Sequence, residues 1–524
     1  MHIDDIPQAA AELEAVTDHL ARRLAGGDPD AHQMDLYELA FAAAEAHSIE
    51  AVGQAAAGGT LPGALATIAA AGAARSAYDR LTAMGDRHGL TEFVDASAAI
   101  RRLAAAADPT TVSEALEQVG VLDELGLTDD LALAAREFRR FAAEVIAPHA
   151  DEIHRTDADI PDSVVDGLAN IGAFGLSIPI RYGGSLEPDQ PDRRPMVIAT
   201  EELSRASLSA GGSLVTRPEI MATALLAGGT DEQRERWLPA IASGRKLVAV
   251  AVTEPDTGSD VAALGTQARP DGDMWILNGA KTWCTFGGRA DLLLVLARTS
   301  SAPGHRGLSL FVVEKERALG REFAAVQPGG GSITGRAIPT IGYRGMHSYE
   351  VTFDRWAVPG SVLVGGDDGI GQGFRLQMEA FAAGRVQTAA RAVGVMRAAF
   401  DTAFDHASNR RAFGQRLIEF GVSRARLAGM AGKIAAGRLT CLAAAAQLDE
   451  EGGDLTAAMV KASTCRSAES VTRDAMQLHG GYGYAEEYPV SRYFVDARVL
   501  SIFEGAEEVL ATKVIARRLM SRLG

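Results

Sequence analysis

Two changes in the spacing of apolar residues constrain the fold of this 524-residue chain more than any other feature. In the first part, apolar side chains recur every three or four positions, which predicts helices. From Lys246 onward they form short alternating or continuous runs, which predict strands. The clearest runs are Leu247–Thr253, Asp291–Leu296, Leu308–Val313 and Tyr349–Phe353. After Pro359 the helical spacing returns, so the predicted order is helical, β and helical.

The changes in spacing also suggest where the domains begin and end. The predicted domains are an Ala-rich helical extension at residues 1–118, a helical domain at 119–245, a middle β-domain at 246–358 and a helical domain at 359–524. Four long segments of the last domain predict a four-helix bundle; they lie near 371–407, 421–451, 455–481 and 501–522. The expected fold class is α+β with an extra N-terminal helical extension.

Local patterns add detail to this prediction. Leu427, Met430, Ile434 and Cys441 share one stripe of a helix and are predicted to face the core. Asn278–Gly279 lies between two short apolar segments and predicts a type I′ hairpin, which needs two residues with positive φ. The Gly-rich run at 327–336 is predicted to be an inserted loop.

Composition excludes several classes of protein. The formal net charge of -17 argues against a nucleic-acid-binding surface, which needs clustered Lys and Arg. Cys284, Cys441 and Cys465 match neither a zinc site nor a disulfide framework, so we expect no metal and a reducing, cytoplasmic setting. The N-terminus lacks the pattern of a secretory signal, and no apolar run is long enough to span a bilayer. Neither nucleic acid nor membrane is an expected partner.

The dinucleotide-binding motifs with the best-known glycine patterns are missing. Gly369-Ile-Gly-Gln-Gly does not have the spacing of the Rossmann fingerprint and does not directly follow a strand, and the chain has no P-loop. Any dinucleotide must therefore be bound in another way.

Three multi-residue motifs carry a resemblance to a known family. They are Val252-Thr-Glu-Pro-Asp-Thr-Gly-Ser-Asp260, Gln477-Leu-His-Gly-Gly-Tyr-Gly-Tyr484 and Ser501-Ile-Phe-Glu-Gly-Ala-Glu-Glu508. Together they resemble the acyl-CoA dehydrogenase family over roughly residues 122–522. The resemblance implies the three-domain fold of that family, FAD bound in an extended pose, and a homodimer or homotetramer whose second subunit completes the cofactor site.

The resemblance assigns two flavin-contacting segments in the β-domain. The first includes Val250, Val252, Thr253, Gly258 and Ser259, and the second includes Trp283, Cys284 and Thr285. Thr253 would back the isoalloxazine ring, and Ser259 would also face the thioester arm of CoA. A flavin that accepts hydride needs hydrogen-bond donors and an aromatic wall that excludes water. The alternative interpretation is that Trp283 is simply a core residue on a strand.

Other cofactor contacts are assigned to the C-terminal domain. Arg410 and Phe413 match residues that touch the pyrophosphate and adenosine of the FAD in the neighbouring subunit, and Arg suits phosphate because its planar fork pairs with oxygens. The segment Gln477–Gly481 would lie along the same cofactor; its members are Gln477, Leu478, His479, Gly480 and Gly481. His479 is expected to pack or hydrogen-bond there. Ala506 and Glu508 replace the polar flavin contacts usual in the family.

Glu504 matches the catalytic glutamate of the family. It would remove the α-proton of an acyl-CoA while hydride leaves the β-carbon for the flavin. Its backbone N–H would stabilise the thioester oxygen, and Gly505 would contact the substrate. Some family members carry the base at the position of Gly384; because Gly cannot act as a base, the role falls to Glu504, and Arg385 would contact the substrate. The alternative is an ordinary exposed Glu at a helix start.

Arg217 is the sharpest clue to the substrate. The matching stretch of the family lines the acyl end of the pocket, where fatty substrates meet mostly neutral side chains. A buried Arg there needs an anion, and the free carboxylate of a dicarboxylic acyl-CoA would supply it. The alternative is an Arg paired with a local acid, Glu219 or Glu202.

The extension, the segment around Arg217 and the ending at Phe503–Glu508 resemble a subfamily that oxidises (2S)-methylsuccinyl-CoA to mesaconyl-CoA in the ethylmalonyl-CoA route. Electron transfer flavoprotein is the expected acceptor. Three alternatives stay open: an acyl-CoA dehydrogenase for another short or branched substrate, a flavin-dependent oxidase, and a non-catalytic DNA-binding relative. The acidic net charge argues against the last.

Overall fold

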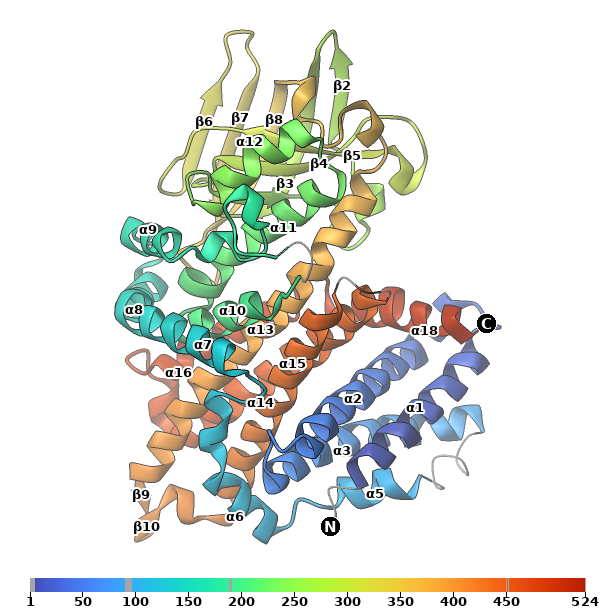
Figure 1. Cartoon of the computed structure of the whole chain (residues 1–524), viewed down its shortest axis with the longest axis vertical. Coiled ribbons are helices and arrows are strands. Elements are labelled where there is room, and N and C mark those ends of the chain that lie inside the picture. Colours follow the sequence, from blue (N-terminus) through green and yellow to red (C-terminus); the bar gives the residue numbers. More distant parts are fainter. Residues whose placement is uncertain (1–4, 90–96, 188–190, 449, 451, 524) are drawn as a thin grey trace. The chain divides into compact units, whose positions relative to one another are not determined.

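The computed structural model describes residues 5–89, 97–187, 191–448, 450 and 452–523 (Figure 1). The chain divides into two compact units. Both ends of the chain form the first, which we call the terminal unit: Met1–Phe138 together with Arg385–Gly524. The second, the central unit, is Arg139–Gly384.

The central unit contains an eight-stranded sheet with the order β1-β4-β2-β3-β8-β7-β6, and β5 pairs with β4. Its strands are β1 (Val248–Ala251), β2 (Gln267–Asp271), β3 (Met274–Thr285), β4 (Leu292–Arg298), β5 (Leu308–Glu314), β6 (Glu322–Val326), β7 (Ser332–Ile338) and β8 (Ser348–Pro359). β1 runs parallel to β4, and β5 is antiparallel to it. The four runs that predict strands from sequence all fall on β1, β4, β5 and β8, as expected.

Helices cover the end of the sheet formed by β1, β4 and β5, because these strands are buried on both faces, whereas β7 and β8 alternate between buried and exposed residues. β4 is buried from Leu292 to Ala297, which leaves no solvated face. Trp237 and Ile220 join the strands in one core. The helices of this unit are α8 (Ala147–Thr156), α9 (Asp162–Asn170), α10 (Arg194–Ala206), α11 (Ser213–Gly228) and α12 (Asp231–Ala242).

The hairpin predicted at Asn278–Gly279 is wrong. Both residues lie inside β3, which runs unbroken from Met274 to Thr285. Only Gly279 has a positive φ, whereas a type I′ turn needs two such residues, and here the pairing with β8 shifts register in a bulge. The real hairpin joins β2 to β3, and Gly272 with a φ of 58° makes its turn.

The loop predicted at 327–336 is also shorter than expected. β7 begins at Ser332 and pairs with β6, so this segment is the turn of a β-hairpin. Gln327 N–H donates to Gly331 O over 2.8 Å and closes the turn.

The terminal unit is helical apart from the small hairpin of β9 (Arg411–Ala412) and β10 (Gln415–Arg416). From the N-terminal part it takes α1 (Asp5–Leu24), α2 (Gln33–Ala57), α3 (Gly63–His88), α5 (Ala98–Ala104) and α6 (Pro109–Glu117). α7 (Asp129–Phe141) follows, and its last residues after Phe138 belong to the central unit. From the C-terminal part it takes most of α13 (Gly373–Asn409), α14 (Gly421–Gln447), α15 (Gly453–His479), α16 (Pro489–Leu500), α17 (Glu507–Val509), a π-helical turn at Leu510–Ile515 and α18 (Ala516–Leu523).

The N-terminal helices pack directly on α14 and α15 (Figure 1). α3 approaches α14 so closely that a Cβ on Gly432 would lie 3.0 Å from the backbone N of Ala69. The predicted stripe of α14 is fully buried, at Leu427, Met430, Ile434 and Cys441. Small residues on both helices permit this contact.

The last predicted helix, near 501–522, starts later than expected. A separate helix, α16, ends at Leu500, and α17 begins only at Glu507. Glu504 and Gly505 between them have φ values of 55° and 107°, which a right-handed helix cannot contain. The predicted end of the 421–451 helix, at residues 449 and 451, lies outside the described residues.

Three further observations concern the described part of the chain. None of its helices is long and apolar enough to cross a membrane. Nor does this part contain a cluster of His, Cys, Asp or Glu that could hold a metal ion. All three cysteines are buried free thiols.

Candidate active site

Glu504 lies in the loop Ser501–Ala506, which joins α16 to α17. Its carboxylate contacts α13: the Thr388 hydroxyl donates to Oε2, and Arg391 Nη2 donates to Oε1 over 2.8 Å. Only 9% of the Glu504 side chain is exposed. This carboxylate is therefore not the exposed helix-start Glu of the alternative interpretation.

Three cationic side chains are buried around this carboxylate. Arg391 binds it directly, and Lys461 on α15 donates to the carbonyl of the next residue, Gly505, over 2.6 Å. Arg385 is buried on α13, and its Nε has no hydrogen-bond partner among the described residues. Burial lowers the pKa of both Arg385 and Lys461, and the charge of Glu504 opposes that shift. The loop thus faces more than one buried positive charge.

Sequence motifs did not identify Thr388, Arg391 or Lys461. Arg385, Thr388 and Arg391 follow one another at a spacing of three, so they share one side of α13. A signal was nonetheless present. Arg391 stands in an Ala-rich run of a buried helix, where an Arg is rarely found without a partner.

The two segments assigned to the flavin lie side by side in the central unit. Thr282 N–H donates to Thr253 O over 2.8 Å, and Lys281 Nζ donates to Val252 O over 3.0 Å. The Trp283 side chain is 54% exposed, and its φ is 58°. It is therefore not the core residue of the alternative interpretation.

The other residues of these segments differ in exposure. Cys284 and Thr285 are buried, and the Thr285 hydroxyl lies 2.9 Å from that of Ser348. Burial raises the pKa of the Cys284 thiol to about 12, so this thiol stays protonated near neutral pH. Gly258 and Ser259 are exposed, Val252 is buried, and Val250 and Thr253 are partly buried.

Arg410 and His479 come together at the far ends of α13 and α15. They help to line a cavity of about 440 Å³, whose other lining residues are Thr402, Asp405, His406, Asn409, Tyr482 and Tyr488. The Arg410 guanidinium lies 5.5 Å from the centre of the Tyr482 ring. His479 is buried, with its Nδ1 2.8 Å from Ala475 O and its ring stacked on His406. It packs and hydrogen-bonds in this structure, as expected.

Most of the other residues that the sequence assigns to the cofactor in the terminal unit are open to solvent. Phe413 is 99% exposed at the tip of the β9–β10 hairpin, where its φ is 51°. Gln477, Gly480, Gly481 and Glu508 are exposed, and Leu478 and Ala506 are partly buried. The terminal unit therefore holds two separate groups of assigned residues. One contains Glu504, Gly505 and Arg385, and the other contains Arg410 and His479.

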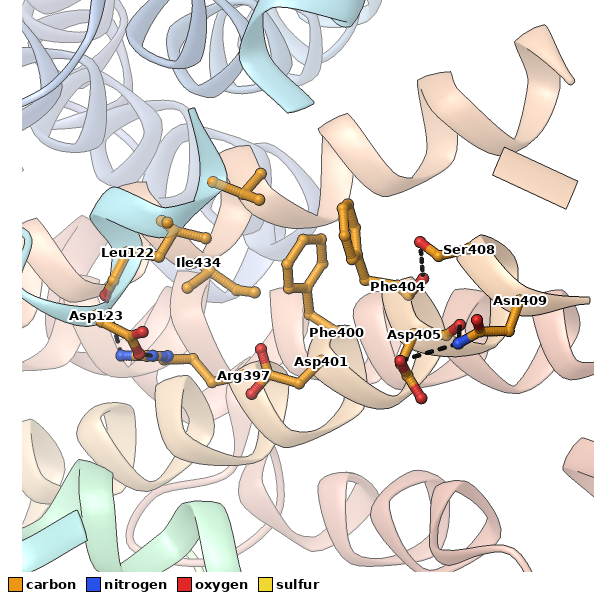
Figure 2. Close-up of a pocket in the computed structure, with 12 residues that line it drawn as sticks. Leu122, Asp123, Arg397, Phe400, Asp401, Phe404, Asp405, Ser408, Asn409 and Ile434 are labelled. Carbon is orange, nitrogen blue, oxygen red and sulfur yellow. Dashed lines mark hydrogen bonds and ion pairs between the residues drawn. The ribbon is translucent and has the colours of Figure 1, made fainter. Parts of the chain in front are cut away.

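Another cavity, of about 420 Å³, opens between the segment Val119–Asp123 and one side of α13 (Figure 2). Arg397 pairs with Asp123 and donates to Leu122 O over 2.9 Å. Phe400, Phe404 and Ile434 give the cavity an apolar wall. None of the residues that the sequence assigns to the cofactor or substrate lines this cavity, so it is separate from the loop of Glu504.

Arg217 is buried in α11 of the central unit, with 6% of the residue exposed. Its Nη1 donates to Ser213 O over 3.2 Å. The two acids of the alternative interpretation pair elsewhere: Glu219 with Arg193 at 3.5 Å and Glu202 with Arg139 at 2.8 Å. Among the described residues Arg217 has no carboxylate partner.

Comparison with known proteins gives matches along most of this chain. Family models described as the N-terminal, middle and C-terminal domains of acyl-CoA dehydrogenase match residues 128–245, 249–356 and 371–520. The (2S)-methylsuccinyl-CoA dehydrogenase of Cereibacter sphaeroides is 43% identical over 397 residues, which are 75% of this chain and 70% of that protein.

Solved structures show the same likeness. Butyryl-CoA dehydrogenase from Megasphaera elsdenii superposes with a TM-score of 0.69 and 30% identity, covering 75% of this chain and 99% of that one. A glutaryl-coenzyme A dehydrogenase in complex with glutaryl-CoA gives a TM-score of 0.68 and 30% identity, covering 75% and 96%.

Proposed function

Because this chain belongs to the acyl-CoA dehydrogenase family of FAD-dependent oxidoreductases, which act on CH–CH bonds, we propose that it oxidises (2S)-methylsuccinyl-CoA to mesaconyl-CoA. The substrate loses a proton from its α-carbon and a hydride from its β-carbon, and a double bond forms between the two. The name of the relative from Cereibacter sphaeroides supports this choice.

Glu504 is the proposed base. A carboxylate suits the task because it can accept the α-proton of a thioester when held within reach of it. Thr388 and Arg391 fix the direction of the carboxylate, and the left-handed backbone at Glu504 turns the loop. A base held in one orientation does not lose activity to unproductive rotamers.

The residues present fit FAD. An exposed indole at Trp283, held in an unusual backbone conformation, offers a face for a ring system, and the exposed Ser259 offers a hydroxyl. Arg410 offers a guanidinium for phosphate oxygens, and Phe413 is a fully exposed ring. When bound, FAD supplies the acceptor for hydride. We assign Arg410 and Phe413 to the cofactor of a second subunit, which makes the protein at least a homodimer.

One observation carries the choice of a dicarboxylic substrate: Arg217 is buried and has no carboxylate partner among the described residues. A buried guanidinium without a counter-charge is costly, because desolvation removes the water that would otherwise stabilise it. The free carboxylate of methylsuccinyl-CoA would supply the missing charge in a bidentate pair.

Replacing Arg217 tests this assignment. Arg217→Met should lower kcat/KM for methylsuccinyl-CoA by roughly two to three orders of magnitude, because removing one member of a buried charge pair costs about 3–5 kcal/mol. For the neutral substrate butyryl-CoA, kcat/KM should fall much less. Steady-state kinetics with both substrates measures the difference.

Arg193→Met is the matched control, because Arg193 pairs with Glu219 within the protein. Its loss should affect both substrates alike. If Arg217→Met lowered kcat/KM equally for both substrates, Arg217 would be structural, and the dicarboxylic assignment would fail.

Electron transfer flavoprotein is the proposed acceptor, and a reoxidation assay in air tests this. Oxygen consumption at a rate comparable with turnover would assign the protein to the flavin-dependent oxidases instead.

A further inference from the structure

The loop that carries Glu504 needs support from outside itself. Its backbone has a positive φ at both Glu504 and Gly505. Glycine adopts such a φ readily, whereas a residue with a side chain, such as Glu504, resists it. Strained conformations of this kind persist only where the surrounding structure holds them. Each contact that fastens the loop therefore bears on the position of Glu504.

Helix α15 supplies two of these contacts. Lys461 Nζ donates to the carbonyl of Gly505 over 2.6 Å. At the other end of the loop, the Ser501 hydroxyl donates to the carboxylate of Glu469. The amide of Glu507 also donates to Ser501 O over 3.1 Å, which closes the loop on itself. These contacts all come from the C-terminal part of the chain.

One further contact comes from the N-terminal extension. The Tyr37 hydroxyl on α2 donates to Oε1 of Glu507, the first residue after the loop in α17. Arg466 on α15 donates to the same hydroxyl over 2.9 Å and pairs with Glu507 at 3.4 Å. Its guanidinium also lies 4.9 Å from the centre of the Phe41 ring. Tyr37, Arg466 and Glu507 thus form a closed triad.

Tyr37 and Glu507 are partly buried, which strengthens the hydrogen bond between them, whereas Arg466 is 46% exposed. Only 16% of the Glu507 side chain is exposed. Burial, followed by the hydrogen bond to Glu507, raises the pKa of Tyr37 to about 12, so this hydroxyl remains a donor throughout the working pH range.

We propose that Tyr37 is a positioning residue for catalysis: through Glu507 it fixes the C-terminal end of the Glu504 loop, so that the N-terminal extension helps to orient the base. This inference rests on the proposed role of Glu504. It gives a catalytic task to a region in which the sequence shows no catalytic motif.

The test uses full-length, flavin-loaded protein. Tyr37→Phe removes the hydroxyl and keeps the ring, which contacts Phe41 at 5.0 Å between centroids. Turnover should fall roughly tenfold, while KM for the acyl-CoA stays within about twofold, because the base is misplaced and the binding surface is unchanged. Tyr78→Phe is the matched control: Tyr78 lies on α3 of the same extension, and its hydroxyl makes no hydrogen bond with the described residues.

A second measurement separates this inference from the identity of the base. Hydrogen exchange of the amides in 501–507 should become faster in Tyr37→Phe than in Tyr78→Phe, whether or not Glu504 is the base. A double-mutant cycle with Glu507→Gln should be non-additive, because both variants break the same contact.

Three results would overturn the proposal: turnover in Tyr37→Phe equal to that of the Tyr78→Phe control, unchanged exchange in the loop, or a loss of turnover fully explained by lost flavin or lower thermal stability. Faster exchange together with wild-type turnover in Glu504→Gln would instead show that the loop is held as described but carries another role.

Discussion

Three of the eight non-glycine residues with positive φ in the described chain are assigned to the site: Trp283, Phe413 and Glu504. Each such conformation costs about 1–3 kcal/mol and persists only where the surrounding fold enforces it. Thr388 and Arg391 hold the Glu504 carboxylate in the position that this backbone conformation gives it. At Glu504, where these contacts hold the side chain, the strain fits a role in function.

Glu504→Gln should keep the shape of the side chain and remove the base. We expect bound flavin and ligand affinity to stay nearly unchanged while turnover falls by about 10²- to 10⁴-fold, the usual contribution of a positioned base. Flavin absorbance and steady-state kinetics measure the two effects. Glu487→Gln, an exposed acid just before α16 with no assigned contact to cofactor or substrate, is the control and should retain turnover. Near wild-type turnover in Glu504→Gln would mean that the base lies elsewhere.

At the scale of elements, α2 links the extension to the helices that carry the site. It packs against α3, α14 and α15. It also carries a partly buried acid, Glu45, whose pKa is raised to about 7, mainly by burial. A hydrogen bond from Ser76 and the charges of Arg80, Arg466 and Lys433 oppose that rise without cancelling it.

Glu45 predicts a dependence of stability on pH. Its pKa is higher in the folded state, so the folded protein binds more protons between the ordinary value of 4.5 and about 7. The free energy of unfolding should therefore fall as pH rises through this window, by up to about 3 kcal/mol, and should change little from this group above it. Urea unfolding followed by circular dichroism at pH 5 and pH 8 measures the difference.

Glu45→Gln should remove this part of the pH dependence, because the amide does not titrate. Glu50→Gln on the exposed side of the same helix should leave it in place. The same pH dependence in all three proteins would mean that Glu45 does not control it.

At the scale of the whole molecule, the N-terminal helices and the C-terminal helices share one compact unit. The close approach at Gly432 and the buried stripe of α14 show that α3 covers an apolar face of the C-terminal helices. We infer that the extension covers surface that other members of the family bury between subunits of a tetramer.

Deleting residues 1–118 should expose this apolar face to water. We expect lower solubility or a change of oligomeric state, because large exposed apolar patches drive association. Sedimentation velocity of the full-length and truncated proteins checks this. A truncated protein that stayed soluble and dimeric but lost substrate affinity would place the extension in the binding site and contradict its covering role.

The sequence alone determined the order of the domains, four of the eight strands and the buried stripe of α14. These features depend on spacing along the chain, which a helix or a strand converts directly into a buried face. Motifs likewise led to the family. Where local spacing misled, as at Asn278–Gly279, pairing with β8 absorbed the dipeptide into a bulge of β3, since a sheet offers more hydrogen bonds than an isolated turn.

Only the tertiary structure decided which side chains meet. Glu504 binds Arg391, which lies 113 positions away, and Glu507 binds Tyr37, which lies 470 positions away. Arg217 lies close in sequence to two acids, yet other arginines pair with both of them. Spacing along the chain carries no information on such partners, because helix packing brings them together and each buried charge pairs with whatever that packing places within reach.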